Sequence, residues 1–128
     1  MSFTVQYFGK ALANITTQDI LNFFSTPRYE DHHLEFKSGQ VRMDKILKEV
    51  SAFLNADGGL IIIGSPREME VAAGQQPPTL GLPDPSFIES EDALHEAIRQ
   101  MIQPHAGGIH IGRVPYMAGF VYLVEINE

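Results

Sequence analysis

The chain has 128 residues, a hydrophobic fraction of 44%, no cysteine and a net charge of −7. This length suits one domain, and the lack of cysteine excludes disulfides, thiolate metal sites and cysteine nucleophiles. The longest apolar run, Leu60 to Ile63, is far shorter than the roughly 20 residues that cross a bilayer, and no secretory signal begins the chain. We therefore expect one cytoplasmic domain over residues 1–128 without membrane contact.

Two elements are predicted near the N-terminus. Residues 3–7 alternate between apolar and polar side chains, which predicts a short strand. Thr16 is followed three residues later by Asp19, and this spacing has the form of a capping box that begins a helix. That helix should end before Pro27, since the residue ahead of a proline is pushed out of helical geometry.

The middle of the chain predicts a strand, a helix and a second strand. Residues 33–37 alternate in polarity, as in a strand with one buried face. Residues 43–55 place apolar side chains at helical spacing, and Asp57-Gly58-Gly59 breaks that helix. The short β-branched run that follows, 60–64, is typical of a central strand buried on both faces.

The last third predicts a loop, a helix and a hairpin. Residues 65–85 hold five of the eight prolines, so we expect a long irregular loop. Ser90 is positioned to cap a helix over 91–102. Residues 109–114 and 120–126 should form strands joined by a short turn. The complete order predicts an α+β fold, an α/β mixed sheet with helices packed on it.

Several short motifs then occur in a fixed order. Glu30 stands five residues before Glu35, which opens Glu35-Phe36-Lys37. A helix ending in Ala52-Phe53-Leu54-Asn55 follows, and then Gly58-Gly59 and Gly64 bracket the apolar strand. This order resembles the Schlafen-type Alba-like domain, whose pattern is roughly E, four residues, EFK, a helix ending in AFxN, and GGxxxxG. The resemblance covers about residues 16–126.

The resemblance implies a role with nucleic acid. Such domains are usually the front part of a longer bacterial transcriptional regulator or ATPase-like protein, so we expect a domain cut from a longer chain or an unusually short member. The implied function is a non-catalytic, DNA-binding regulatory domain, with DNA or RNA as partner and no cofactor.

An alternative is a metal-dependent endoribonuclease, because some animal relatives of this family cleave RNA with three acidic residues. Two of those acids match Glu30 and Glu35, which would hold Mg²⁺ or Mn²⁺. The third usually follows the glycine after the apolar strand, often within G-V-D-D. Here that stretch reads Gly64-Ser65-Pro66-Arg67-Glu68. The aspartate is missing, and Glu68 is the nearest substitute.

Basic residues supply candidate contacts to phosphate: Lys37, Arg42, Lys45, Lys48, Arg67 and Arg113. The first three of these would form a small patch if the loop after residue 37 folds back beside the next helix. Scattered bases on an acidic protein are more often simply solvated, and binding through bulk charge does not suit a charge of −7. A protein-interaction or ligand-sensing domain that forms a homodimer through edge strands is therefore a third hypothesis.

Asn55, Gly58, Gly59 and Gly64 also have two interpretations. The structural one is a helix end turned by glycines, which lets the chain enter the sheet tightly. The functional one is close approach of a phosphate to the backbone. A phosphate loop of the G-K-[ST] type does not fit, because these glycines precede a strand and not a helix.

Overall fold

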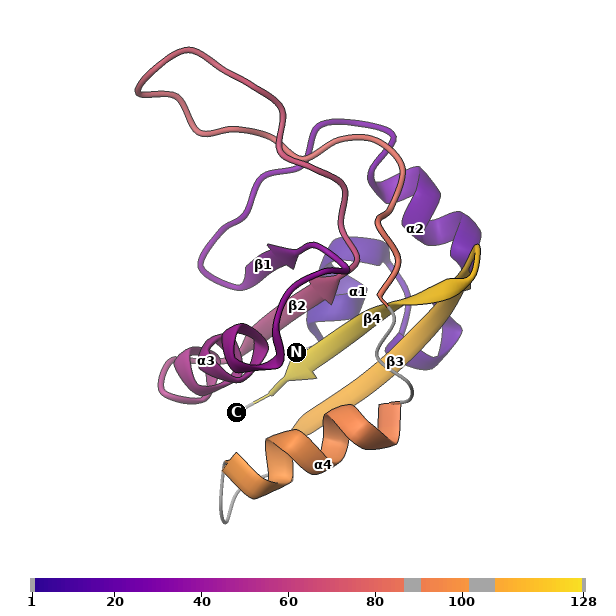
Figure 1. Ribbon diagram of the computed structural model, residues 1–128, viewed down its shortest axis with the longest axis vertical. Helices are drawn as coiled ribbons and strands as arrows, with labels where there is room; N and C mark the ends of the chain where they lie inside the picture. Colours follow the sequence, from indigo (N-terminus) through magenta and orange to yellow (C-terminus); the bar gives the residue numbers. More distant parts are fainter. Residues whose placement is uncertain (1, 87–90, 102–107, 128) are drawn as a thin grey trace.

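A four-stranded mixed sheet forms the centre of the computed structural model, which describes residues 2–86, 91–101 and 108–127 (Figure 1). Its strands are β1 (Leu34–Lys37), β2 (Gly59–Ile63), β3 (Ile109–Tyr116) and β4 (Gly119–Ile126), in the order β1-β2-β4-β3. β1 runs parallel to β2, whereas β2 and β3 each run antiparallel to β4. The predicted α+β fold with a mixed sheet is confirmed.

Strand β2 is buried along its whole length, as its unbroken apolar sequence predicts. Leu60 and Ile62 point into one hydrophobic core, and Ile61 and Ile63 point into a second core on the other face. The segment Glu35-Phe36-Lys37 lies directly beside it, in register with residues 61–63. The two motifs singled out in the sequence are therefore neighbours in the sheet.

Helices cover both faces of the sheet (Figure 1). The helices α3 (Met43–Leu54) and α4 (Glu91–Met101) pack on the face that carries Ile61 and Ile63. The shorter helices α1 (Phe3–Phe8) and α2 (Thr17–Phe23) pack on the opposite face, together with the 3-10 helix η1 (Leu12–Asn14). Ser90 and Ile102, predicted to cap and to end the last helix, lie outside the described residues.

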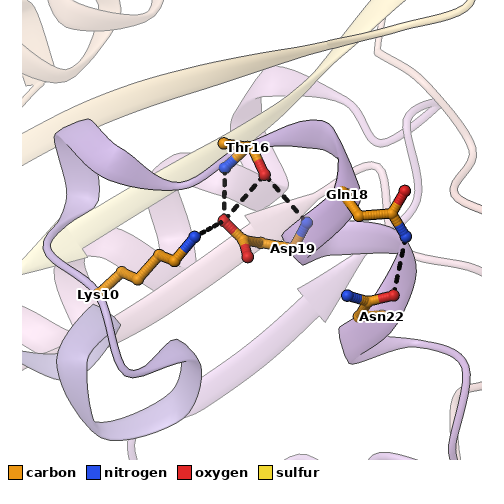
Figure 2. A network of polar contacts seen from close by, with 5 residues as sticks. All are labelled: Lys10, Thr16, Gln18, Asp19 and Asn22. Carbon is orange, nitrogen blue, oxygen red and sulfur yellow. Dashed lines mark hydrogen bonds and ion pairs between the residues drawn. The ribbon is translucent and has the colours of Figure 1, made fainter.

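Helix α2 begins with the capping box that the sequence predicts (Figure 2). The Thr16 hydroxyl accepts a hydrogen bond from the Asp19 amide at 3.2 Å, and the Asp19 carboxylate accepts one from the Thr16 amide at 2.8 Å. Lys10 Nζ lies 3.0 Å from the same carboxylate. The two hydrogen bonds satisfy amides at the start of the helix that would otherwise lack a partner.

The predicted strand over residues 3–7 is wrong, because this segment forms helix α1. Alternating polarity over five residues also places Phe3 and Tyr7 one helical turn apart, and both pack in the same core. A residue distant in the sequence favours the helix over the strand. Glu125 on β4 accepts hydrogen bonds from the Ser2 hydroxyl at 2.9 Å and the Thr4 amide at 3.0 Å, which fixes the start of the helix against the sheet.

The proline-rich segment after β2 is the long loop that its composition predicts, and backbone hydrogen bonds tie down its base. Arg28 and Thr79 exchange two of them, at 2.9 and 2.7 Å, and the Asp84 amide donates to Gly64 O at 2.8 Å. Residues 69–78, here called the arm, project from the body of the protein (Figure 1). In the described ranges, no helix combines the length and apolar character needed to cross a membrane.

Candidate functional site

The carboxyl groups of Glu30 and Glu35 meet at the outer edge of β1. Glu30 precedes the strand, and its Oε2 accepts a hydrogen bond from the Phe36 amide at 2.8 Å. Glu35 lies on the strand, on the face that α3 covers, and its carboxyl group forms a hydrogen bond with that of Glu30. The structure thus brings together the two acids that the sequence motif singles out.

This proximity changes the protonation of the pair. Burial raises the pKa of Glu35 from its ordinary 4.5 to about 8, and the hydrogen bond and negative charge of Glu30 add to the rise. The charge of Glu49 acts in the same direction, whereas that of Lys37 opposes it. Two neighbouring carboxylates cannot both ionise freely, so the pair keeps a proton to a higher pH than an isolated glutamate does.

Lys37 lies between two acids on the same side of the sheet. Its Nζ is 3.8 Å from Glu35 Oε2 and 3.7 Å from Glu49 Oε1 on α3. Its carbonyl oxygen accepts hydrogen bonds from the Gly64 amide at 2.7 Å and from the Ser65 amide and hydroxyl at 3.0 Å each. These contacts join the end of β1 to the segment after β2 and keep the Lys37 ammonium close to carboxylates.

The third acid proposed from the sequence, Glu68, belongs to a different part of the structure. It is exposed and pairs through a β-bridge with Thr79 at the base of the arm. Ser65, the first residue after the glycine, is buried and bonded to Lys37, and Pro66 is buried as well. Across the described ranges, no three His, Asp or Glu side chains gather into a group that could hold a metal ion, and this applies to Glu30, Glu35 and Glu68.

Most basic side chains already have a partner. Within the described ranges, six of the nine lysine and arginine side chains form an ion pair or lie over an aromatic ring: Lys10, Arg28, Lys37, Arg42, Arg99 and Arg113. Arg42, the N-cap residue of α3, contacts Asp44 at 2.9 and 3.1 Å. The predicted patch of Lys37, Arg42 and Lys45 therefore has two of its three charges balanced by neighbouring acids.

The three remaining cations are Lys45, Lys48 and Arg67. All three side chains are exposed, and none forms an ion pair with an acid of the described structure. Lys45 and Lys48 lie on the solvent side of α3, opposite its buried residues Ile46 and Val50. Their charges are available to a partner molecule.

Arg67 lines a pocket of about 490 Å³, which we call the strand-end pocket. Its lining residues are Gln40, Pro66, Arg67, Leu80, Leu82, Pro83 and Asp84. Gln40 comes from the loop that follows β1, and Pro66 and Arg67 come from the segment that follows β2. The other four residues come from the end of the long loop, where the chain returns to the sheet. The sequence did not reveal this pocket, because nothing in it showed that β1 and β2 are parallel and end side by side.

The glycines around β2 are packed against the protein itself. Asn55 is the C-cap of α3, and Gly58 turns the chain with a φ of 89° that favours glycine. A side chain at Gly58 would strike the backbone of Ile126, and one at Gly59 would strike the ring of Phe53. Gly64, with a φ of 112°, makes the corresponding turn after β2. The space beside the Gly58-Gly59 pair is therefore filled by protein atoms.

The family model described as Schlafen, AlbA_2 matches residues 30–128, which is more than half of the chain. The chain belongs to this family. The match begins at Glu30, the first acid of the pair, and runs through both glycine motifs. Membership of the Schlafen/AlbA_2 family indicates a nucleic-acid-related domain. Among curated proteins, no relative matches the chain.

Proposed function

We propose that this chain is a non-catalytic, nucleic-acid-binding regulatory domain that contacts phosphates through Lys45, Lys48 and Arg67. The observation that carries the proposal is the distribution of partners among the basic side chains. On a chain with a net charge of −7, six cations in the described structure form an ion pair or lie over an aromatic ring, and these three do neither. Lysine and arginine bind nucleic acid by displacing counterions from phosphate, which requires such accessible charge.

The surroundings of the acidic pair support a non-catalytic role. Lys37 lies within 4 Å of Glu35 and Glu49, so a cation of the protein itself already balances charge there. Pro66 and Arg67 occupy the positions at which the RNA-cleaving relatives of this family often carry aspartate. Glu30, in turn, has a structural task, because it accepts a hydrogen bond from the Phe36 amide.

The test measures binding of fluorescent single-stranded and double-stranded DNA and RNA by anisotropy, from about 50 to about 200 mM salt. The variant Lys45→Ala/Lys48→Ala is compared with the control Lys10→Ala/Arg99→Ala. The control also removes two positive charges, but from residues that form ion pairs with Asp19 and Glu96. We expect the first variant to lower the slope of log affinity against log salt by about 0.7 to 0.9 for each lost phosphate contact. The control should keep the wild-type slope.

Three results would overturn the proposal or a part of it. Equal loss of binding in the test variant and the control would show that general charge, and not the α3 surface, is responsible. No binding to any of the four polymers at low salt would remove the function itself. Cleavage of RNA in Mn²⁺ that disappears in Glu35→Gln would overturn the non-catalytic part and favour the endoribonuclease alternative.

A further inference from the structure

The strand-end pocket lies where the fold gathers the ends of two parallel strands. β1 and β2 run in the same direction with Lys37 beside Ile63, so the loops after both strands leave from the same edge of the sheet. Crevices at the carboxyl ends of neighbouring parallel strands are the common place for ligands in α/β sheets. The volume of about 490 Å³ falls within the range of small-molecule pockets, about 300 to 1,000 Å³.

The walls of the pocket combine one cation, two polar groups and several apolar surfaces. Arg67 supplies the positive charge and has no ion pair within the described structure. Leu80, Leu82, Pro66 and Pro83 supply the apolar surface, and the Leu82 side chain is exposed to 73%. An exposed leucine beside an available arginine suits a ligand that has both a flat apolar face and an anionic group.

The polar groups are fixed in position to different degrees. Asp84 is held at the base of the loop, because its amide donates to Gly64 O at 2.8 Å and its Oδ2 accepts from the Gly39 amide at 3.2 Å. Among the described residues, no group donates to its other carboxylate oxygen, which can therefore accept a hydrogen bond from a ligand. Gln40 faces the same pocket with a side-chain amide that can donate and accept. Together they match the hydrogen-bonding edge of a nucleobase.

We propose that the strand-end pocket binds one unstacked nucleotide, with its phosphate on Arg67 and its base between Leu82 and the prolines. A residue of a single-stranded nucleic acid and a free mononucleotide share this chemistry, and only the first source rests on the function proposed above. The Asp84 carboxylate accepts hydrogen bonds but cannot donate them. Uracil can offer the carboxylate only its N3–H, which is flanked by two carbonyl oxygens that the carboxylate repels, so bases that carry an exocyclic amino group bind more tightly.

The experiment follows the backbone amide resonances of the whole chain during titration with AMP, CMP, GMP, UMP and inorganic phosphate. We expect shifts confined to residues 39–41, 67, 80–82 and 84, because Pro66 and Pro83 carry no amide proton, and weaker binding of UMP than of CMP. Arg67→Ala should weaken CMP binding by about tenfold or more, whereas Arg99→Ala, the matched control, should leave it unchanged. Asp84→Asn keeps an oxygen for the Gly39 amide but adds a donor, so it should narrow the difference between CMP and UMP.

A second series separates the two sources of nucleotide. If a short single strand shifts the amide resonances of the same residues more strongly than a duplex of the same sequence does, the polymer is the ligand. Shifts with CMP but not with the single strand identify the free nucleotide. Lys45→Ala/Lys48→Ala should leave CMP binding intact, so failure of polymer binding in that variant does not count against the pocket.

Three outcomes would overturn the inference. Inorganic phosphate that binds as tightly as CMP would reduce the pocket to an anion site. Equal affinity of CMP in the wild type and Arg67→Ala would place the nucleotide elsewhere. No binding of any mononucleotide or single strand at residues 39–41 and 80–84 would leave the pocket without this role, while polymer binding that depends on Lys45 and Lys48 would still support the function proposed above.

Discussion

Glu30 Oε2 accepts a hydrogen bond from the backbone amide of Phe36 at 2.8 Å, and this contact closes part of the open edge of the sheet. Just beside it, Asp31 and Leu34 exchange two backbone hydrogen bonds, at 3.1 and 3.3 Å. The outward-facing amides of Leu34 and Phe36 are thus bonded to the residues directly ahead of the strand. An edge strand with free amides can pair with another chain, and these contacts occupy two such amides.

Replacing Glu30 should destabilise the protein through this edge. At about pH 5.5, where Glu35 is protonated and does not repel its neighbour, Glu30→Ala removes the acceptor of the Phe36 amide and should lower the free energy of unfolding by about 1 to 2 kcal/mol. Glu30→Gln retains an oxygen acceptor and should lose less. Urea denaturation monitored by circular dichroism measures both values, and equal stability of the two variants would contradict the assigned role.

The raised pKa of Glu35 makes stability depend on pH in a defined direction. Its pKa rises from 4.5 in the unfolded chain to about 8 in the folded one, so the folded state binds more protons between these values and stability falls as pH rises through that window. Glu35→Gln cannot ionise. Relative to the wild type it should therefore gain about 1 to 3 kcal/mol between pH 5 and pH 8, a range reduced for the partial exposure of the group.

The measurement for Glu35 is thermal or urea unfolding of both proteins across that pH range, with Glu70→Gln as the control because Glu70 is exposed on the arm. The control should follow the wild-type curve. Parallel curves for Glu35→Gln and the wild type would mean that Glu35 titrates at its ordinary pKa.

The capping box of α2 gives a third prediction. Thr16→Ala removes the hydroxyl that accepts from the Asp19 amide and should destabilise the protein by about 1 kcal/mol (Figure 2). Lys10→Ala removes only an ion pair at the surface and should leave stability unchanged within error. Differential scanning calorimetry of the two variants tests the contrast. A larger loss in Lys10→Ala than in Thr16→Ala would reverse the assignment.

The fourth prediction concerns the attachment of α1. Glu125 is only 5% exposed and accepts hydrogen bonds from the Ser2 hydroxyl and the Thr4 amide. Glu125→Ala leaves a buried amide without a partner and should lower the free energy of unfolding by about 1 to 3 kcal/mol. Hydrogen exchange of residues 3–8 should accelerate more than that of β2. Ser2→Ala removes one of the two contacts and should show a smaller effect, and unchanged exchange in Glu125→Ala would disprove the attachment.

Local patterns were sufficient to predict the parts of the fold that local chemistry determines. The capping residues of α2, the helical spacing over 43–55 and the apolar run Leu60 to Ile63 each act within a few residues, and each prediction is confirmed. The segment over 3–7 was predicted incorrectly because its conformation depends on Glu125, more than 100 positions away. A five-residue alternation is compatible with both a strand and one face of a short helix.

In the candidate site, too, the sequence predicted what depends on nearby residues and missed what depends on distant contacts. The spacing of Glu30 and Glu35 pointed to a carboxyl pair, and the structure brings the two together. Which cations stay available could not be predicted, because Lys37 is balanced by Glu49 from a separate helix. The strand-end pocket escaped prediction for a related reason: Gln40 and Asp84 become neighbours only once the long loop returns to the end of β1.

The bonds at the base of the arm also determine how the protein can be altered. Met69 donates to Pro78 O at 2.8 Å, and Thr79 is joined to Arg28, so the chain is clamped on both sides before it reaches the tip. Residues 70–75 are all exposed beyond that clamp. The free energy of closing a loop changes little with added length. Foreign residues can therefore be inserted in this segment, or a fluorescent dye attached at the exposed Ala73, without disturbing the strands, a convenient handle for the titrations described above.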